Sequence, residues 1–258
     1  MVKFEEYAGK FKTVKMERRD GILQLTLHTD GKELRWGLLP HEELPEAFFY
    51  VGQDRENRVV ILTGTGTEFS GPTPDPNNPS FPTRPEAFAF DKVYYEGKSL
   101  LMNMLNIEVP MISAVNGPAI RHSELPLLCD IVLAAEEASF QDSGHFISKL
   151  MPGDGVHIVY PMLLGLNRGR YFLLTGQILN ATEAKDLGLV NEVLPRAKLL
   201  ARAWEHAEKL IKYPPLHLRY TRVILTEYLR RRMQELLGYG LMLEGMALME
   251  RPLPPQSR

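Results

Sequence analysis

Two histidines and one aspartate follow apolar segments in the middle of the chain. His122 comes after the apolar run 111–115, and His145 and Asp154 come after a second run, 125–135. Loops at the ends of buried strands are where a scaffold usually presents reactive groups. A histidine can take a proton near neutral pH, and a carboxylate that accepts its other ring N–H fixes the tautomer. The pattern indicates a site with a general base, but on these residues alone ordinary surface loops remain an open alternative.

The same side chains have rival interpretations. Two histidines and one carboxylate can also bind a metal ion. The chain has no His-x-His or His-x-x-x-His pair, so the spacing does not support a metal, and we predict neither metal nor cofactor. His157 is interpreted as a packing residue. Ser123 has no base arrangement of its own, which gives a serine-hydrolase mechanism little support.

Strands and helices alternate around these residues. Alternating apolar positions on either side of Asp20-Gly21 predict a hairpin. The apolar runs predict buried strands, and the spacing of apolar residues predicts long helices. A proline-rich stretch follows Phe69, which we expect to be either an ordered loop over the site or a flexible surface loop. The sequence therefore predicts a layered α/β unit. The predicted strands are 12–19, 22–28, 58–64, 111–115 and 125–135, the helices are 41–52, 86–105, 197–212 and 215–249, and the proline-rich loop is 70–85.

Composition is that of an ordinary soluble enzyme. The chain has 258 residues, 44% hydrophobic and 24% charged, with a formal net charge of −2. This charge gives no reason to expect a nucleic acid or an anionic membrane as a partner. There is no run of about 18 apolar residues, and the charged N-terminus does not resemble a secretory signal, so we expect a cytoplasmic protein. The single cysteine, Cys129, is expected to be buried in a strand.

The last quarter of the chain differs from the rest. We divide the chain into a core, residues 1–195, and a C-terminal helical region, residues 196–258. The second helix of that region is rich in Leu and Met between positions 225 and 243, and such an apolar surface needs a cover. On the sequence alone the cover is either the protein's own core or another copy of the chain. Glu244 falls inside this stripe as a lone carboxylate.

Several motifs, in order along the chain, resemble the crotonase (enoyl-CoA hydratase/isomerase) superfamily. They are Val60–Gly64, Ala114–Ala119, Cys129–Ile131, Pro152–Gly155, Leu173–Gly176 and Ala184–Asn191. The resemblance extends over residues 12–250. It implies an α/β fold with a ββα spiral core. It also implies a C-terminal helical region that packs on the core and on neighbouring subunits, in a homotrimer or a dimer of trimers.

Departures from the family pattern point to a smaller branch. Arg121-His122-Ser123 replaces a run of glycines, His145 replaces a catalytic glutamate of the hydratases, and the segment 70–79 replaces an A-G-A-D loop. Together these changes resemble the β-diketone hydrolases of the 6-oxocamphor hydrolase type. That branch cleaves the carbon–carbon bond between two carbonyl groups without coenzyme A. The residues that match its pattern are Trp36, His41, His122, His145 and Asp154.

The resemblance implies a retro-Claisen reaction on a compact, apolar (bi)cyclic β-diketone, which yields a keto acid. We expect His122 to take a proton from water and Asp154 to orient His122. The collapsing adduct releases an enolate, and His145 and the Trp36 indole N–H are the expected donors to its oxygen. Glu244 is expected to reach the site from the last helix, with His41 as its partner.

Two other function classes stay open. A coenzyme A-dependent hydratase or isomerase would need backbone amides near Thr73 and Arg121 as an oxyanion hole. Prolines at 72, 74, 76 and 79 argue against it, since proline has no amide hydrogen. A non-catalytic member of the fold is the third class, and the set of matching site residues argues against it. Glu124 matches one hydratase glutamate and is interpreted as a remnant or a structural acid.

Overall fold

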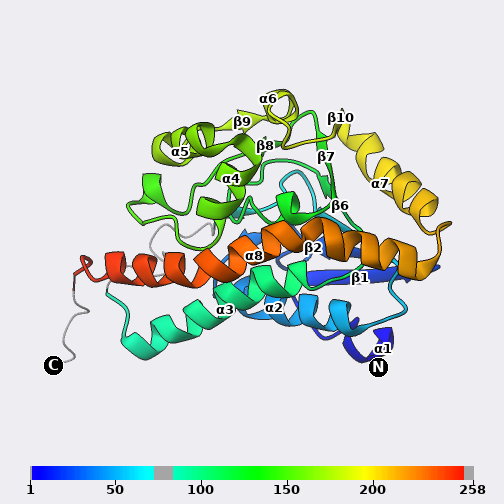
Figure 1. Cartoon of the computed structure of the whole chain (residues 1–258), viewed down its shortest axis with the longest axis horizontal. Helices are drawn as coiled ribbons and strands as arrows, with labels where there is room; N and C mark the ends of the chain where they lie inside the picture. The colour runs from blue at the N-terminus through cyan, green and yellow to red at the C-terminus, as the bar shows by residue number, and fades with distance from the viewer. Residues whose placement is uncertain (1, 73–83, 253–258) are drawn as a thin grey trace.

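A six-stranded sheet forms the centre of the protein in the computed structural model, which describes residues 2–72 and 84–252 (Figure 1). Its first two strands are antiparallel, and all later neighbours are parallel. The strand order is β1 (Val14–Arg19), β2 (Ile22–Leu27), β4 (Val59–Gly64), β6 (Met111–Val115), β7 (Ile131–Ala135) and β10 (Glu192–Leu194). Two small sheets pair β3 (Arg35–Trp36) with β5 (Gly71–Pro72) and β8 (Ser139–Phe140) with β9 (Leu179–Asn180).

Helices surround this sheet on several sides. Helix α7 packs against β4, β6 and β7, whereas α3 packs against both α2 and α8. The longest helix, α8, crosses the view in Figure 1 with α3 alongside it. The α-helices are α1 (Phe4–Tyr7), α2 (Leu38–Gln53), α3 (Ala87–Leu105), α4 (Val156–Leu164), α5 (Leu166–Thr175), α6 (Ala181–Asp186), α7 (Arg196–Leu210) and α8 (Pro215–Leu248). Two 3₁₀ turns, Pro126–Leu128 and Phe146–Ser148, lie in the loops.

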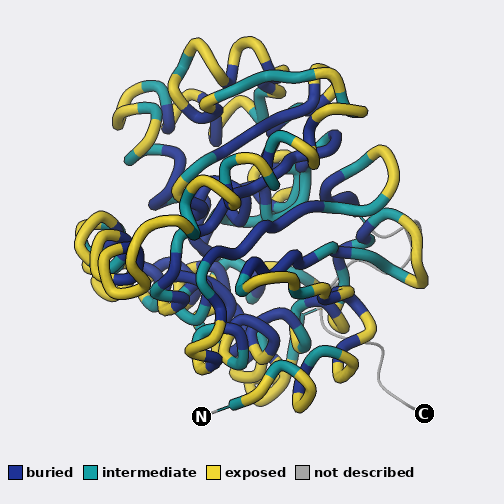
Figure 2. Tube along the Cα trace, turned by 90° about the vertical axis from the view of Figure 1, so that its right-hand side faces the viewer, coloured by how far each residue is buried: buried dark blue, intermediate teal, exposed yellow. Residues whose placement is uncertain are grey.

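The α/β fold with a ββα spiral core and C-terminal helices is confirmed. The hairpin forms where predicted, because Asp20 and Gly21 both have positive φ, 53° and 79°, as a type I′ turn requires. Strand β4 is buried along five of its six residues, as is typical of a central parallel strand. In Figure 2 the buried trace runs through the middle of the molecule and the exposed trace surrounds it.

Two predicted elements have different limits in the structure. Residues 125–135 do not form one strand, because Pro126 begins a 3₁₀ turn and the strand starts only at Ile131. Cys129 is buried, but it lies between that turn and the strand. Helix α2 begins at Leu38, three residues before His41, and Pro40 is tolerated in its first turn because the amide that it lacks would have no partner in the helix. Within the predicted proline-rich loop, 73–83 lie outside the described residues.

The apolar stripe of α8 divides between two environments. Met233, Leu237 and Leu241 are buried in the protein's own core, whereas Leu225 is 70% and Met242 54% exposed. A trimer that covers the exposed part therefore remains a prediction from the resemblance. In the part of the chain that the structure describes, no helix is long and apolar enough to span a membrane.

The fold places three loops at one edge of the sheet. Strands β4, β6 and β7 are parallel, so the segments that follow them leave on the same side. Short bridges from Ser70 to Ala119 and from Ala119 to Phe140 tie these segments together. The backbone amide of Ile120 also donates to the Ser70 carbonyl over 3.0 Å. These contacts hold the loops, with their predicted site residues, next to this edge of the sheet.

Candidate active site

A cavity of about 210 Å³ lies at this edge. Its wall comes from the segment that joins β3 to the start of α2, from α3, from the loops after β6 and β8, from the turn before α4, and from α8. All six residues proposed from the sequence line it, namely Trp36, His41, His122, His145, Asp154 and Glu244. The structure thus brings together side chains that are as far apart in the sequence as Trp36 and Glu244.

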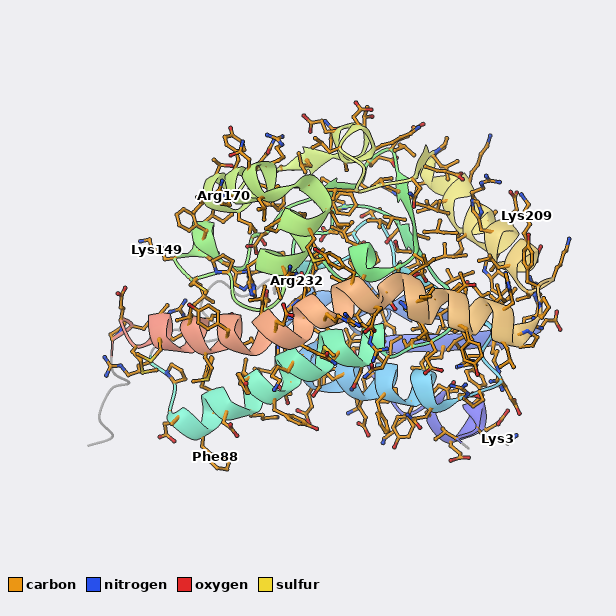
Figure 3. All side chains as sticks on the ribbon, viewed as in Figure 1. Lys3, Phe88, Lys149, Arg170, Lys209 and Arg232 are labelled. Atoms are coloured by element: carbon orange, nitrogen blue, oxygen red, sulfur yellow. The ribbon has the colours of Figure 1, made fainter. Side chains whose placement is uncertain are left out.

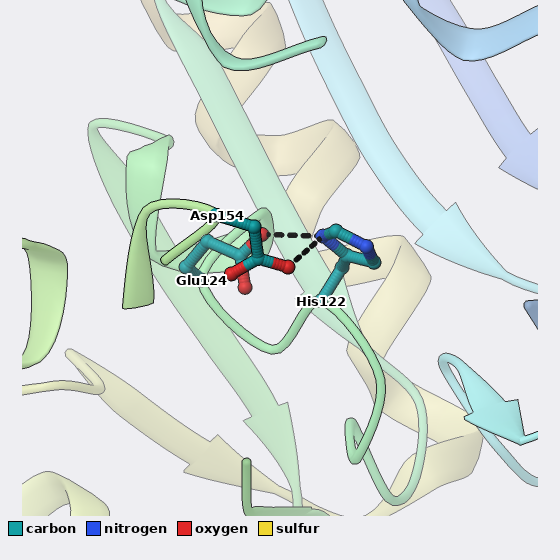
Figure 4. Close-up of side chains that lie close together, drawn as sticks. All are labelled: His122, Glu124 and Asp154. Carbon is teal, nitrogen blue, oxygen red and sulfur yellow. Dashed lines mark hydrogen bonds and ion pairs between the residues drawn. The ribbon is translucent and has the colours of Figure 1, made fainter. Parts of the chain in front are cut away.

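His122 has one ring nitrogen held and the other directed to the cavity. Its Nδ1 lies 2.8 Å from Glu124 Oε1 and 3.5 Å from Asp154 Oδ2 (Figure 4). Its Nε2 has no hydrogen-bond partner among the described residues, and His122 lines the cavity. With Nδ1 protonated and donating to Glu124, Nε2 carries the free lone pair. This is the tautomer that a general base needs.

The backbone at His122 is unusual. Its φ of 45° is in the left-handed region, which is uncommon for a residue with a bulky side chain. The His122 carbonyl accepts a hydrogen bond from the Leu125 amide over 3.1 Å, which closes the turn. Such conformations persist where the surroundings hold them, and they concentrate at functional sites.

Burial alone would lower the pKa of His122, but the Glu124 and Asp154 carboxylates outweigh it. The pKa of His122 is therefore raised above its ordinary value of 6.5. Glu124 is fully buried, and burial raises its own pKa. From the sequence, Glu124 is expected to be a remnant or a structural acid. The structure makes it the closer carboxylate to His122, so Asp154 is not the only group that orients this imidazole.

His145 is enclosed by carboxylates. Its Nδ1 lies 2.7 Å from Asp142 Oδ1, and its Nε2 lies 3.3 Å from Asp154 Oδ2 and 4.0 Å from Glu244 Oε2. Burial would lower the pKa of His145, but Asp154 and Asp142 raise it well above 6.5. At neutral pH this ring is an imidazolium whose two N–H groups point at carboxylates. Asp142 was not among the residues predicted from the sequence, although it lies only three residues before His145.

Asp154 stands between the two imidazoles. Burial would raise its pKa, but His145 and His122 lower it below the ordinary value, so it is ionised. The turn before α4 packs against α8 so closely that a Cβ on Gly153 would lie 2.4 Å from the Gly240 carbonyl oxygen. Only glycine fits there. This close approach places Asp154 beside Glu244.

Glu244 is a buried carboxyl group in the cavity wall. Burial, with a further contribution from Asp154, raises its pKa to about 8. At neutral pH it is therefore mostly a neutral acid that can donate a hydrogen bond. The expected partnership with His41 is not what the structure shows. His41 Nδ1 instead lies 3.3 Å from Glu96 Oε2, because α2 packs directly against α3.

Trp36 packs on His122. Their ring centroids are 3.9 Å apart, with the planes tilted by 37°. The Trp36 indole N–H has no hydrogen-bond partner among the described residues, and the side chain lines the cavity. A substrate oxygen can therefore accept from it.

The carboxylates and His122 are also close enough together to bind a metal ion. One ligand atom each from His122, Glu124 and Asp154 lie within 4.8 Å of one another. This set shares two residues with the metal alternative considered from the sequence and replaces His145 with Glu124. The hydrogen bond between His122 and Glu124 gives the same cluster a role without a metal.

Comparison with known proteins places the chain in a family. The sequence profile "Enoyl-CoA hydratase/isomerase" matches residues 17–245. The chain belongs to this family, which is the crotonase superfamily. Among its curated relatives, an enoyl-CoA isomerase/hydratase of Mycosarcoma maydis is 32% identical over 50% of this chain. The chain spans only 47% of that relative's length. A hydroxycinnamoyl-CoA hydratase-lyase of Pseudomonas fluorescens is 29% identical over 83% of this chain and 78% of its own length.

Several solved structures resemble this chain over more than nine-tenths of its length, and one of them is not named as a hydratase or isomerase. It is a β-diketone hydrolase from the cyanobacterium Anabaena, bound to (S)-3-oxocyclohexyl acetic acid. The identity is 48%, the TM-score is 0.89, and the match covers 95% of this chain and 97% of the other. The predicted relationship to β-diketone hydrolases is thereby confirmed at the level of similarity.

Proposed function

We propose that the protein hydrolyses the carbon–carbon bond between the two carbonyl groups of a (bi)cyclic β-diketone and releases a keto acid. The observation that carries this proposal is His122, whose Nδ1 is held by a buried carboxylate while Nε2 is directed to the cavity. The similarity to the Anabaena β-diketone hydrolase supports the substrate class. The bound keto acid of that protein is the kind of product that such a reaction gives.

In the first step, water attacks one carbonyl carbon. The Nε2 of His122 takes one water proton, and the new imidazolium keeps its Nδ1–H on Glu124. Glu124 and Asp154 stabilise the positive charge that forms on the ring, as the aspartate of a serine-protease triad does. The oxygen of the attacked carbonyl becomes the oxyanion of a tetrahedral adduct.

In the second step, the adduct collapses. The bond between the attacked carbon and the carbon between the carbonyls breaks, and its electron pair moves to the second carbonyl as an enolate. The Trp36 indole N–H and the neutral Glu244 carboxyl can donate hydrogen bonds to these oxygens. The proton that His122 took from water is returned to the enolate carbon, which completes the keto acid and restores the neutral imidazole.

His145 has a different part in this scheme from the one expected. Both its N–H groups already point at carboxylates, so it is not a free donor to the enolate oxygen. As a fixed cation, it keeps Asp154 ionised and favours the negative charge that develops in the cavity.

The arrangement gives little support to coenzyme A chemistry. The glutamate that matches a hydratase catalytic acid, Glu124, is fully buried and bonded to His122. The position of the second hydratase glutamate is occupied by His145. Neither carboxylate is thus available to activate water beside a thioester.

The test is turnover. Purified protein is incubated with a bicyclic 1,3-diketone and, separately, with crotonyl-CoA, and the products are separated by chromatography. We expect the diketone to be converted to a keto acid and crotonyl-CoA to stay unchanged. Hydration of crotonyl-CoA without diketone cleavage would replace this proposal with the hydratase alternative.

A further inference from the structure

Arg121 is a basic residue of the cavity with no role in the scheme above. It directly precedes His122, and its side chain lines the cavity. Its backbone is fixed, because the Ser70 hydroxyl donates to the Arg121 carbonyl over 2.5 Å and the preceding amide, that of Ile120, is bonded to Ser70. The loop therefore holds the start of this side chain in place beside the general base.

The guanidinium group rests on Gly144, the neighbour of His145. A Cβ at position 144 would lie 2.8 Å from Arg121 Nη1, so a glycine there makes room for the arginine. Asp142 and Asp154 are near enough to act on Arg121 electrostatically, yet neither forms an ion pair with it. Both aspartates are paired with histidines instead.

An arginine in this position lacks a partner of its own. Among the described residues, none accepts a hydrogen bond from its guanidinium or pairs with it within 4.0 Å. Arg121 is half-buried, and burial lowers its pKa because the guanidinium is partly removed from water. A partly buried cation is unfavourable unless an anion neutralises it, and a guanidinium suits a carboxylate because both are planar and bidentate.

The proposed reaction supplies such an anion. The diketone is neutral. The attacked carbonyl carbon becomes the carboxylic acid group of the product, and this group loses its proton at neutral pH. We infer that Arg121 binds this carboxylate, so that the attacked carbonyl of the substrate lies on the Gly144 side of the cavity. The inference rests on the proposed function for the origin of the anion. The carboxylate site itself can be tested without turnover.

The test is binding of two matched ligands by calorimetry at pH 7.5. They are 3-oxocyclohexyl acetic acid, which carries a carboxylate, and its primary amide, which has the same shape and no charge. Each is titrated into the wild-type protein, Arg121→Gln and Arg121→Lys. Arg170→Gln is the control for loss of a surface charge, since Arg170 is exposed on α5 (Figure 3).

We expect the wild type to bind the acid more tightly than the amide. Arg121→Gln should weaken binding of the acid by about 10- to 100-fold, the usual loss for a charge-assisted hydrogen bond. Amide binding should stay the same, which also shows that the pocket is folded. Arg121→Lys should bind the acid with intermediate affinity, because it keeps the charge and loses the bidentate geometry.

Acid binding that Arg121→Gln leaves unchanged, or a wild type that binds acid and amide equally, would overturn the inference. The result is separate from the fate of the proposed function. Loss of acid binding in a protein that cleaves no diketone would keep the carboxylate site and reject the reaction. Diketone cleavage with unchanged acid binding in Arg121→Gln would keep the reaction and reject the site.

Discussion

The two histidines of the cavity have opposite surroundings. His122 has a carboxylate at one ring nitrogen and the open cavity at the other. His145 has carboxylates at both nitrogens, Asp142 at 2.7 Å and Asp154 at 3.3 Å. One ring can therefore accept a proton from substrate water, and the other stays charged. In the proposed reaction, the same residue type therefore serves as a base at one position and as a fixed cation at the other, because its partners differ.

The largest effect is expected from His122→Ala. Loss of a general base costs about 10²–10⁴ in rate, so kcat on the diketone should fall by that factor with a small change in KM. Steady-state kinetics measure this, and His217→Ala, at an exposed histidine of α8, is the matched control. His145→Ala should keep a detectable kcat, and its activity should still fall at acidic pH as His122 becomes protonated. If His122→Ala keeps near-wild-type kcat, the assignment of the two histidines is reversed.

The next effect separates the two carboxylates near His122. Glu124 is 0.7 Å closer than Asp154, 2.8 Å against 3.5 Å, so Glu124→Gln should lower kcat by about 10- to 100-fold. Because Glu124 raises the pKa of His122, its loss should also shift the acid limb of kcat/KM to lower pH. A double variant, His122→Ala with Glu124→Gln, should be hardly slower than His122→Ala alone. Losses that multiply would show that Glu124 acts independently of His122.

The pH profile should have two limbs. Activity should rise with pH as His122 loses its proton, through a pKa above 6.5, since only the neutral ring is a base. It should fall again above about pH 8, where Glu244 ionises and stops donating a hydrogen bond. Glu244→Gln, which keeps a donor and cannot ionise, should remove the alkaline limb. An unchanged alkaline limb in that variant would exclude Glu244 as its source.

The smallest effect is expected from metal removal. His122, Glu124 and Asp154 lie close enough to hold a metal ion, but the proposed mechanism uses none. Dialysis against a chelator should therefore leave kcat within about twofold. If the chelator abolishes activity and added zinc or magnesium restores it, these three residues bind a catalytic metal ion and His122 is not a free base.

The sequence predicted the residues of the cavity better than their contacts. Loops after parallel strands can be placed from apolar runs, and the resemblance supplied Trp36, His41 and Glu244, which no spacing connects to His122. All of them line one cavity. The hydrogen-bond partners of these residues could not be predicted in the same way. Whether Glu124 or Asp154 is closer to His122 depends on the left-handed backbone at His122. The spacing of apolar residues in the sequence does not predict such a turn.

In the helices, too, the limits of the elements could be predicted but the side-chain contacts could not. The limits of α3 and α8 agree with the predicted helices to within one residue, since long apolar periodicity is a strong signal. The contact of His41 with Glu96 instead of Glu244 depends on how α2 lies against α3. Glu96 was not proposed, although its position on an amphipathic helix beside a predicted site could have raised the question. Packing angles of this kind are set by the whole core.

In the proposed reaction, water attacks a carbonyl carbon and the carbon–carbon bond breaks to give an enolate. The direct measurement is hydrolysis of a bicyclic 1,3-diketone in H₂¹⁸O and, separately, in D₂O, with the product analysed by mass spectrometry and NMR. The account predicts one ¹⁸O atom in the carboxylate, beyond the exchange of the unreacted diketone, and one deuterium on the carbon that lay between the carbonyls. A product without ¹⁸O in its carboxylate, or without deuterium at that carbon, would contradict it.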